Sequence, residues 1–561
     1  MEISNKTLQG YENAKVIHYL DAGALPNQVL YDDLPNREVV GVLKGNRYID
    51  GKLTQLYSTN ENHVGVIAAT RLGKTTSYVM PTILSFARQK KKRSMFISDP
   101  KGEVYRHTAT TLRNEGYTVL LLNFRDCLHS ECWNPLTPIF RKYRRAVTVA
   151  DEVVVVETAN GPQYEFHGEI YDDYQALNQA VEGAGDMLMN DVGNDIDTIA
   201  AMIITTETQK DPYWENAARE VLKAFLWGML EDSNKPENPI TEDTFSFNTI
   251  FTLQLLLVAK QRSDFEDDGY FTERDPSSKA YQYAKNTLIC NGDVTRSCIL
   301  AVFSTKMAVF RESAVRLITS CNSFEMSKLA NGPTAVFIDY RDEVESHYAI
   351  ISLFVQDAYR YLIGQANDKP DGKLEVPFYF VLDEFGNFPP IPDFKTTISA
   401  CAGRNIFFIL ILQSYAQLDA VYDKAATIIR DNLNMHVFLG SNNPETLEQF
   451  SKECGLKTRL SPLSALNGRG EDIEYYQTET ISAVPKSRLA HFEPGECIIT
   501  EANSGYVLFA KLERYYLLDE MKNLPIAFAK DYKGAVNPFD RKYVYAYSKA
   551  PAKRSWSDFD A

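Results

Sequence analysis

The sequence predicts an α/β fold in which a mainly parallel sheet, built around a phosphate-binding loop, is interrupted by an all-α insertion domain. Short, continuously apolar strands alternate with helical patterns in residues 63–136 and again in residues 331–519, which is typical of βαβ units. Residues 137–330 instead carry apolar residues at helical spacing. We therefore expect the two outer segments to form one domain and the insertion to form another.

The two ends of the chain differ from this pattern. Residues 1–62 are polar with short β-like stretches at 39–43 and 47–49, and we expect them to pack as an N-terminal segment on the domain that follows. Residues 520–561 form a polar and aromatic C-terminal tail, for which we expect a mobile segment or a docking peptide.

The first half of the predicted sheet begins at a strand over residues 64–68. It is followed by a helix over 74–89, a strand over 94–98, a helix over 102–115 and a strand over 118–123. In the insertion, Asp211 and Pro212 are suited to start a helix that continues through 217–230. The acidic stretch 264–269 is interpreted as a solvated loop.

Strands return in the second half at residues 334–339, 378–383, 406–413 and 435–440. Residues 456–480 are predicted to be a long polar loop. A hairpin is predicted from 497–500 and 506–512, with its turn at 503–505.

Residues 64–76 have the layout of a phosphate-binding loop, with a buried strand, a tight turn and the start of a helix. Gly73, Lys74 and Thr75 match the last three positions of the pattern Gly-x₄-Gly-Lys-Ser/Thr, whereas Ala68 stands where its first glycine belongs. Lys74 would reach the β- and γ-phosphates of a nucleotide, and the Thr75 hydroxyl would bind Mg²⁺. A turn that merely joins a strand to a helix is the alternative.

Backbone N–H groups of this loop would point at the phosphates, helped by the positive end of the helix that begins near Lys74. The predicted nucleotide-binding residues are Ala69, Thr70, Arg71, Leu72, Gly73, Lys74, Thr75 and Thr76.

A second group of polar residues follows the strand predicted at 378–383. Asp383 would hold Mg²⁺ through water opposite Thr75, and Glu384 would polarise the attacking water as general base. Charged residues that end a strand only for solubility are the alternative. The presence of both motifs in the right chain order favours a hydrolytic site.

The next predicted strand ends at Gln413, whose amide can bond both water and a phosphate oxygen, so we expect a γ-phosphate sensor there. Arg404 lies just before the same strand. In a ring it could stabilise transition-state charge in the neighbouring subunit, and Arg430 competes for that role.

The composition is that of an ordinary globular protein, with 561 residues for roughly two to four domains. Its net charge of −15 argues against non-specific coating with nucleic acid, although a local basic lining of a DNA-binding surface stays an open alternative.

Eight scattered cysteines without a CxxC pair indicate reduced thiols in a cytoplasm. The longest apolar runs, 251–259 and 406–412, are too short to span a bilayer.

Two further groups have plain structural interpretations. Asp99 and Pro100 can cap and start a helix, which leaves Lys101 and Glu103 as the unexplained residues at that edge of the sheet. Cys127 and Cys132, with His129 between them, could be metal ligands. Without a second pair nearby, ordinary core or loop cysteines are favoured.

Several motifs in a fixed order carry a family resemblance over roughly residues 60–515. They are Asp99-Pro100-Lys101-Gly102-Glu103, Trp133-Asn134-Pro135-Leu136, Asp383-Glu384-Phe385-Gly386, Gln413-Ser414, Gly440-Ser441 followed by Thr446, Val484-Pro485-Lys486-Ser487-Arg488-Leu489 and Pro494-Gly495-Glu496. In this order they resemble the type IV secretion coupling proteins, the TraG/TraD-type conjugative DNA-transfer ATPases.

The resemblance implies a RecA-like nucleotide-binding domain that uses ATP and Mg²⁺, interrupted by an all-α domain and assembled as a homo-hexamer. Such proteins link a relaxase–DNA complex to a type IV secretion channel and drive the transfer. The insertion would receive the relaxase and relaxosome accessory proteins. The DNA would be bound independently of sequence, through its phosphates and as a single strand.

The transmembrane hairpin that the resemblance implies is not found near the N-terminus. We therefore expect a soluble member, a trimmed cytosolic part, or a protein that borrows an anchor at the cytoplasmic face of the membrane. Two other functions stay open. One is a nucleotide-switched recruitment platform with little motor activity; the other is a different P-loop DNA translocase, against which the motifs at 99–103 and 133–136 argue.

Overall fold

The computed structural model describes most of the chain, in the ranges 15–18, 28–36, 41–49, 52–158, 161–205, 212–237, 239–260, 269–466, 472–502, 504, 506–519, 521–537 and 539–543. Two compact units are formed. Unit 1 comprises Met1–Leu121 and Met326–Tyr532, and unit 2 comprises Leu122–Glu325 and Lys533–Ala561. Asp211, the acidic stretch 264–268, the turn residues 503 and 505 and residues 544–561 lie outside the described ranges.

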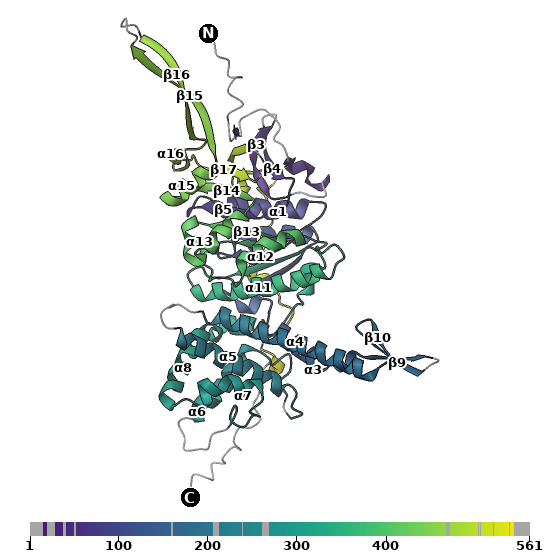
Figure 1. The fold of residues 1–561 in the computed structure, drawn as a ribbon. Helices are drawn as coiled ribbons and strands as arrows, with labels where there is room; N and C mark the ends of the chain where they lie inside the picture. Colours follow the sequence, from purple (N-terminus) through teal and green to yellow (C-terminus); the bar gives the residue numbers. More distant parts are fainter. Residues whose placement is uncertain are drawn as a thin grey trace. The chain divides into compact units, whose positions relative to one another are not determined.

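Unit 1 is built on one large sheet (Figure 1), whose strands run in the order β2-β4-β3-β18-β17-β14-β5-β13-β12-β6-β11-β7, with β1 also paired to β18. The strands are β1 (Lys15–His18), β2 (Gln28–Leu30), β3 (Leu43–Ile49), β4 (Lys52–Ser58), β5 (Val64–Ala68), β6 (Ser94–Asp99), β7 (Thr118–Asn123), β11 (Thr334–Asp339), β12 (Phe378–Leu382), β13 (Ile406–Leu412), β14 (Met435–Gly440), β17 (Glu496–Glu501) and β18 (Tyr506–Lys511).

The centre of this sheet is parallel, as predicted. β14, β5, β13, β12, β6 and β11 pair side by side in parallel register. Every residue of β5, β6, β11, β12 and β13 is buried, because helices cover both faces of the sheet. The pairs of β17 with β14 and with β18 are antiparallel, so the predicted closing hairpin is confirmed.

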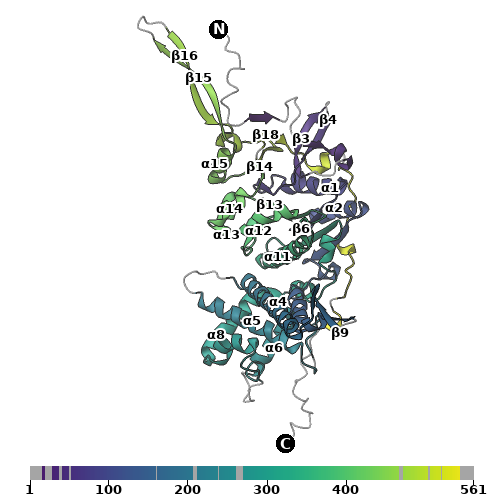
Figure 2. The same ribbon diagram turned by 45° about the vertical axis from the view of Figure 1, so that its right-hand side comes forward.

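The helices of unit 1 connect these strands (Figures 1 and 2). They are a π-helical turn (Lys74–Val79), α1 (Met80–Arg88), α2 (Glu103–Asn114), α10 (Ser327–Ala330), α11 (Glu345–Asn367), α12 (Phe394–Cys401), α13 (Tyr415–Tyr422), α14 (Ala425–Asp431), α15 (Pro444–Glu453) and α16 (Lys486–Leu489). The predicted helix over 74–89 is therefore a π-helical turn continued by α1.

The prediction of a polar loop over residues 456–480 is wrong. These residues form the two-stranded antiparallel sheet of β15 (Leu456–Leu466) and β16 (Asp472–Ser482). No other described strand pairs with it, which is why Pro462 is tolerated inside β15. Irregular polar and apolar residues in this segment hide the alternation that would have indicated a strand.

Unit 2 is mainly helical, whereas the insertion was predicted over residues 137–330 to be all-α. Its helices are α3 (Thr137–Val147), α4 (Tyr174–Ile203), α5 (Tyr213–Asp232), α6 (Phe247–Lys260), α7 (Lys279–Ala284), α8 (Asp293–Lys306) and α9 (Ser313–Ile318). It also holds a three-stranded antiparallel sheet that the sequence analysis did not predict, made of β8 (Val154–Thr158), β9 (Gly161–Phe166) and β10 (Glu169–Tyr171).

Hydrogen bonds from the motif at residues 133–136 join the start of the insertion to its end. Trp133 N–H donates to the Ile318 carbonyl at 2.7 Å. The Asn134 side-chain amide donates to the Phe245 carbonyl at 2.8 Å, and its backbone N–H donates to Asn322 Oδ1 at 2.9 Å. Because Asn134 is buried, these bonds replace those that water would make.

The described part of the tail differs from the expected mobile or docking peptide. In unit 1, Met521 belongs to the main hydrophobic core and the Ala527 N–H donates to the Arg106 carbonyl at 2.8 Å. In unit 2, Tyr543 packs with Cys132 and Cys321. These contacts hold the described tail residues to their own chain. Within the described ranges, no helix has the length and apolar character needed to cross a bilayer.

Candidate active site

The loop after β5 combines an exposed turn with the start of a helix. Arg71 and Gly73 have φ angles of 69° and 83°, in the left-handed region that glycine adopts freely. The Ser77 N–H donates to the Gly73 carbonyl at 2.7 Å, so the helical bonds begin at the loop. Thr76 does not face the carboxylates that line the site; its hydroxyl donates to the Gly73 carbonyl at 3.3 Å.

Ala68 is the buried last residue of β5 and does not have a positive φ. It pairs with Gly440 of β14, whose carbonyl accepts from the Ala69 N–H at 2.9 Å. Gly440 has φ 137°, and a Cβ there would lie 2.9 Å from the Cδ1 of Leu72 in the loop. The close approach that requires a glycine therefore occurs at position 440, on the neighbouring strand, and alanine is not strained at position 68.

Replacing Ala68 with glycine is expected to lower stability without tightening nucleotide binding. Ala68 already has ordinary strand geometry, so glycine adds only backbone entropy to the unfolded chain, about 0.5–1 kcal/mol. Thermal melts and nucleotide titrations of the two proteins test this. A clear gain in affinity for Ala68→Gly would contradict it.

Four side chains from two distant parts of the sequence meet in front of the loop. Lys74 Nζ forms an ion pair with Glu384 Oε1 and lies 3.2 Å from Asp383 Oδ1. The Thr75 hydroxyl donates to Asp383 Oδ2 at 3.4 Å. These residues come from the start of the π-helical turn and the end of β12, which lies two strands from β5 in the sheet.

β13 lies between β5 and β12, and Gln413 follows its last residue. Gln413 Nε2 donates to Glu384 Oε2 at 3.0 Å, and its backbone N–H donates to Gln417 Oε1 at 2.9 Å. The structure therefore brings Gln413 together with Lys74, Thr75, Asp383 and Glu384.

Ser98, at the end of β6, fixes the backbone that carries the two acids. The Asp383 N–H donates to Ser98 Oγ at 2.7 Å, and the hydroxyl donates back to the Asp383 carbonyl at 3.2 Å. Glu384 has φ 54°, an uncommon conformation for a non-glycine residue that marks local strain. Sequence reasoning assigned no role to Ser98, because a serine in a strand carries no distinctive pattern.

Burial and charge act in opposite directions on this group. Burial raises the pKa of Asp383, and the Lys74 ammonium only partly offsets the rise. Burial lowers the pKa of Lys74, but Asp383 and Glu384 outweigh it and leave that pKa raised. Lys74 is therefore a firmly charged cation that neutralises the carboxylates beside it.

The cavity at this group is small, about 20 Å³, and its lining includes Lys101, Glu103 and Asp342 beyond the residues above. It has space for about one water molecule. The ion pair of Lys74 with Glu384 closes one side of it. The oxygens of Thr75 and Asp383 are hard ligands that suit Mg²⁺, which proteins bind through one or two such groups together with substrate phosphates. The donor set thus fits a Mg²⁺–nucleotide.

Asp99 also lines this cavity, and one of its oxygens bonds to the first turn of α2. Oδ2 accepts from the Tyr105 N–H at 2.8 Å, whereas Oδ1 is buried without a hydrogen-bond partner. Burial raises the pKa of Asp99 to about 7, and the Asp339 carboxylate adds to the rise. The prediction that Asp99 caps the helix and Pro100 starts it is wrong in position, because the cap residue is Gly102 and α2 begins at Glu103. Asp99 still satisfies one N–H of the first turn, that of Tyr105.

Asp99→Asn is expected to stabilise the protein more at pH 8 than at pH 4. Native Asp99 keeps its proton up to about pH 7, whereas the unfolded chain releases it near 3.8, so wild-type stability falls as pH rises between these values. Asparagine keeps an acceptor for Tyr105 and has no such titration. Denaturant unfolding of both proteins from pH 4 to 8 measures the difference. A stability difference that does not change with pH would contradict the assignment.

Arg404 lies at the opposite end of its strand from the site. Arg404 precedes β13, and Gln413 follows that strand about 23 Å further on. Arg404 contacts Asn367 Oδ1 at 3.4 Å and the Ala400 carbonyl at 3.0 Å. Arg430 pairs with Asp419 Oδ1 at 2.7 Å and lies over the Tyr415 ring. The structure does not bring either arginine to the site of its own chain.

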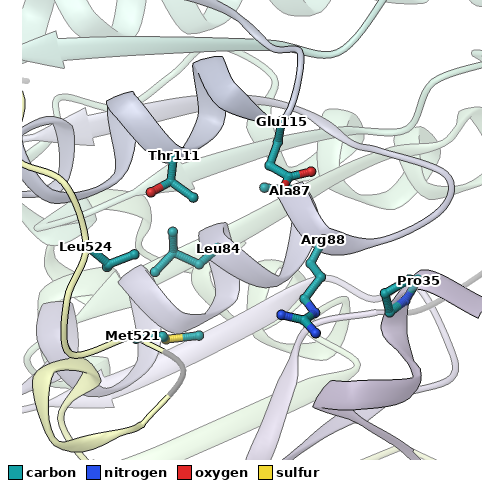
Figure 3. A pocket seen from close by; sticks show the side chains of 8 residues that line it. All are labelled: Pro35, Leu84, Ala87, Arg88, Thr111, Glu115, Met521 and Leu524. Atoms are coloured by element: carbon teal, nitrogen blue, oxygen red, sulfur yellow. The ribbon is translucent and has the colours of Figure 1, made fainter.

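A larger cavity of about 400 Å³ lies elsewhere in unit 1 (Figure 3). It is lined by Pro35, Leu84, Ala87, Arg88, Thr111, Glu115, Met521 and Leu524. None of the predicted nucleotide-binding or catalytic residues lines it. The size of a cavity is therefore a poor guide to the chemistry of this chain.

Known relatives include two that cover about three quarters of this chain at low identity. The VirD4 protein of Agrobacterium fabrum is 22% identical over 420 residues, 74% of this chain and 52% of that protein. The conjugal transfer protein TraG of Escherichia coli is 21% identical over 437 residues, 75% of this chain and 59% of that protein. An uncharacterized protein of Bacillus anthracis is 33% identical over 112 residues, 20% of this chain and 41% of that protein. The chain spans about half the length of the curated relatives it matches.

Among solved structures, the unbound monoclinic form of the bacterial conjugative coupling protein TrwBdeltaN70 matches with a TM-score of 0.53 and 14% identity. The match covers 95% of this chain and 98% of that one. This likeness confirms the predicted fold class, a RecA-like α/β domain with a mainly parallel sheet.

Comparison of the chain with known protein families tests the resemblance that the motifs suggest. The family described as type IV secretory system conjugative DNA transfer matches residues 27–465, well over half of the chain. The structure agrees, because the motifs at Lys74, Asp383, Glu384 and Gln413 meet at one edge of a parallel sheet. The chain belongs to the type IV secretory system conjugative DNA transfer family.

Proposed function

We propose that this chain is an ATP-hydrolysing coupling protein, which recruits a relaxase–DNA complex to a type IV secretion channel and drives its transfer. The observation that carries the proposal is the convergence of Lys74, Asp383, Glu384 and Gln413 at the carboxyl edge of β5, β12 and β13. Ligands of open α/β sheets bind at this edge.

Each residue has a distinct part in the proposed hydrolysis. Lys74 leaves the carboxylates and binds the β- and γ-phosphates, while the loop N–H groups from 69 to 76 surround them. Thr75 and Asp383 would hold Mg²⁺, whose charge would stabilise the phosphate oxygens as the bond breaks. Glu384 accepts a proton from the attacking water, and Gln413, already bonded to Glu384, orients that water.

The proposed partners are DNA, the relaxase with its accessory proteins, and components of the secretion channel. The active form proposed is a homo-hexamer. DNA is expected to be bound through its phosphates, so its affinity should fall steeply with salt and vary little with sequence.

ATP hydrolysis measured with and without single- and double-stranded DNA tests the proposal. DNA is expected to raise the rate, more strongly as a single strand. A rate that ignores DNA and survives the loss of Lys74 would overturn it.

Arg404→Ala is expected to lower turnover by roughly 10³-fold with little loss of stability, if Arg404 acts in the neighbouring site. Arg430→Ala is expected to lower the melting temperature as well, because Arg430 holds Asp419 and Tyr415. Mixing inactive Arg404→Ala and Lys74→Ala proteins should restore activity, since each supplies what the other lacks. If mixing restores no activity, Arg404 does not act in the site of a neighbouring subunit.

A second function, capture of a protein partner by unit 2, is favoured by the charge of the segment that begins after α3. From Ala146 to Thr205 the sequence contains no lysine or arginine. Pull-down of relaxosome proteins that is unchanged in Lys74→Ala would support a recruitment role independent of nucleotide.

A further inference from the structure

The segment from Ala146 to Thr205 is the most one-sidedly charged part of the chain. It has twelve acidic residues and neither lysine nor arginine, and the acidic residues are Asp151, Glu152, Glu157, Glu165, Glu169, Asp172, Asp173, Glu182, Asp186, Asp191, Asp195 and Asp197. Within the described residues, cations from other segments reach only three of them: Arg145 pairs with Glu152, Lys142 with Asp195 and Lys223 with Asp197. Most of the negative charge is therefore uncompensated.

This segment folds as the sheet β10-β9-β8 and the long helix α4 (Figure 1). In Figure 1, β9 and β10 lie at one end of α4, away from α5 and α8. One face of the sheet packs on α4 through Tyr164, Phe166 and Tyr171. No other described strand covers the free edge of β8, whose only partner is β9.

β8 is apolar although it is an edge strand. Val154, Val155 and Val156 are 55%, 55% and 40% exposed. Edge strands in natural proteins are usually short, charged or covered, because their free N–H and C=O groups can pair with another chain. Three consecutive exposed valines at such an edge indicate a surface that is covered by something.

The outer face of the sheet carries an acidic side chain among apolar ones. Val154 pairs with Glu165 of β9, and Glu165 pairs with Ile170 of β10, so these three side chains share one face. Ile170 is 65% exposed, and Glu165 is exposed and forms no ion pair with another described residue. The face therefore combines apolar contact with negative charge.

Charge decides between the possible occupants of this edge. A second copy of the chain would bring the same acidic segment against itself, and like charges placed together are costly. DNA and anionic membrane surfaces are polyanions and would be repelled as well. A protein segment that is extended, basic and partly apolar matches the edge, the valines and the charge together.

We propose that the free edge of β8 binds an extended basic segment of a protein partner as an added strand. Main-chain hydrogen bonds to β8 hold the segment, its apolar side chains cover Val154 and Val156, and its basic side chains lie near Glu165. The proposal rests on the proposed coupling function for the identity of that partner, but the binding itself needs neither nucleotide nor hydrolysis.

Peptide titration of the full chain tests the proposal directly. The probe is a fluorescent ten-residue peptide, Val-Thr-Lys-Thr-Val-Thr-Lys-Thr-Val-Thr, whose valines and lysines lie on one face of a strand. It is compared with a peptide that has glutamate in place of each lysine. The lysine peptide is expected to bind and the glutamate peptide is not, and binding should weaken several-fold between about 50 mM and 500 mM salt. Equal binding of the two peptides would overturn the charge argument.

Two N-methylated versions of the lysine peptide test strand addition. One is methylated at its threonines and the other at its valines and lysines, so that each removes the donors along one edge of the peptide. At least one version is expected to lose binding. If both bind as tightly as the unmodified peptide, the segment is not added as a strand.

Matched variants locate the surface. Glu165→Lys reverses an exposed charge on the proposed face and should weaken the lysine peptide by about five-fold. Glu237→Lys makes the same charge change at an exposed site of unit 2 outside the acidic segment, and should have little effect. Equal losses in the two variants would mean that only net charge matters and would overturn the assignment to β8.

Lys74→Ala separates this inference from the proposed function. Peptide binding is expected to be unchanged in Lys74→Ala, whatever the result of the hydrolysis assay, because no residue of the phosphate loop lies in the segment that binds. A peptide that binds only when the loop can bind nucleotide would overturn the inference and leave the proposed function intact.

Discussion

Glu384→Gln is expected to abolish ATP turnover while tightening nucleotide binding. The carboxylate is the proposed base, and its loss removes roughly 10²- to 10⁴-fold of rate. The same carboxylate holds Lys74 by an ion pair across the small cavity, and phosphates must take its place. Glutamine has the same shape and keeps an oxygen that accepts from Gln413, but it cannot form the ion pair with Lys74. Nucleotide binding to the variant therefore does not have to break that ion pair.

Single-turnover hydrolysis and equilibrium titration with ATP measure the two effects separately. Glu375→Gln is the matched control, because Glu375 is exposed and precedes the same strand at its opposite end. We expect tighter binding by several-fold and no measurable turnover in Glu384→Gln, with neither change in the control. Hydrolysis at the wild-type rate would remove Glu384 from the chemistry, and weaker binding would show that Glu384 does not compete with phosphate for Lys74.

The core of the site was predictable because each part has a local signal. Gly73, Lys74 and Thr75 stand after a buried apolar strand, and Asp383 and Glu384 end another. Parallel strands bring their carboxyl ends to one edge, so chain order alone suggested that these groups meet. β13 lies between the other two strands, and this position brings Gln413 within hydrogen-bond distance of Glu384. The neighbouring motifs suggested this strand order, but the periodicity of the sequence could not establish it.

The parts that were missed lack such a local signal. Val153 to Val156 read as a continuous apolar run, which usually means a buried strand, whereas three of the four are exposed at a sheet edge. Ser98 and Asn134 act through hydrogen bonds to residues far away in sequence. Their roles depend on tertiary contacts, so no spacing within the sequence reveals them.

The position of Ala68 illustrates how a departure from a motif can be harmless. The pattern assigns the first glycine to the position after four strand residues, but in this chain the close backbone approach is made at Gly440 of the neighbouring strand. A sequence motif describes only the phosphate-binding loop itself, so it cannot show that a glycine on a neighbouring strand makes the close backbone approach.

Lys74→Ala is expected to weaken nucleotide binding and hydrolysis strongly and to make stability depend more steeply on pH. Loss of a charged hydrogen-bond donor to phosphate weakens binding by roughly 10- to 150-fold, and turnover falls at least as far. The ammonium also lowers the pKa of Asp383, which burial raises, so removing it allows that pKa to rise further.

The sign of the pH effect follows from that pKa. A carboxyl whose pKa is raised in the folded state binds a proton that the unfolded chain has released, so stability falls as pH rises from the unfolded pKa to the folded one. The melting temperature of Lys74→Ala should therefore fall below that of wild type at pH 8 and approach it at pH 5. Lys395→Ala removes an exposed lysine from the same unit and should change neither binding nor the pH profile.

A second substitution separates the two consequences of losing Lys74. Adding Asp383→Asn to Lys74→Ala removes the buried charge, so it should restore stability at pH 8 without restoring nucleotide binding. Asp383 Oδ1 accepts from the Glu384 N–H at 2.9 Å, and asparagine keeps an oxygen for that bond. If the double variant is no more stable at pH 8 than Lys74→Ala, the ion pair is not what neutralises Asp383; if it binds nucleotide, Lys74 is not the residue that holds the phosphates.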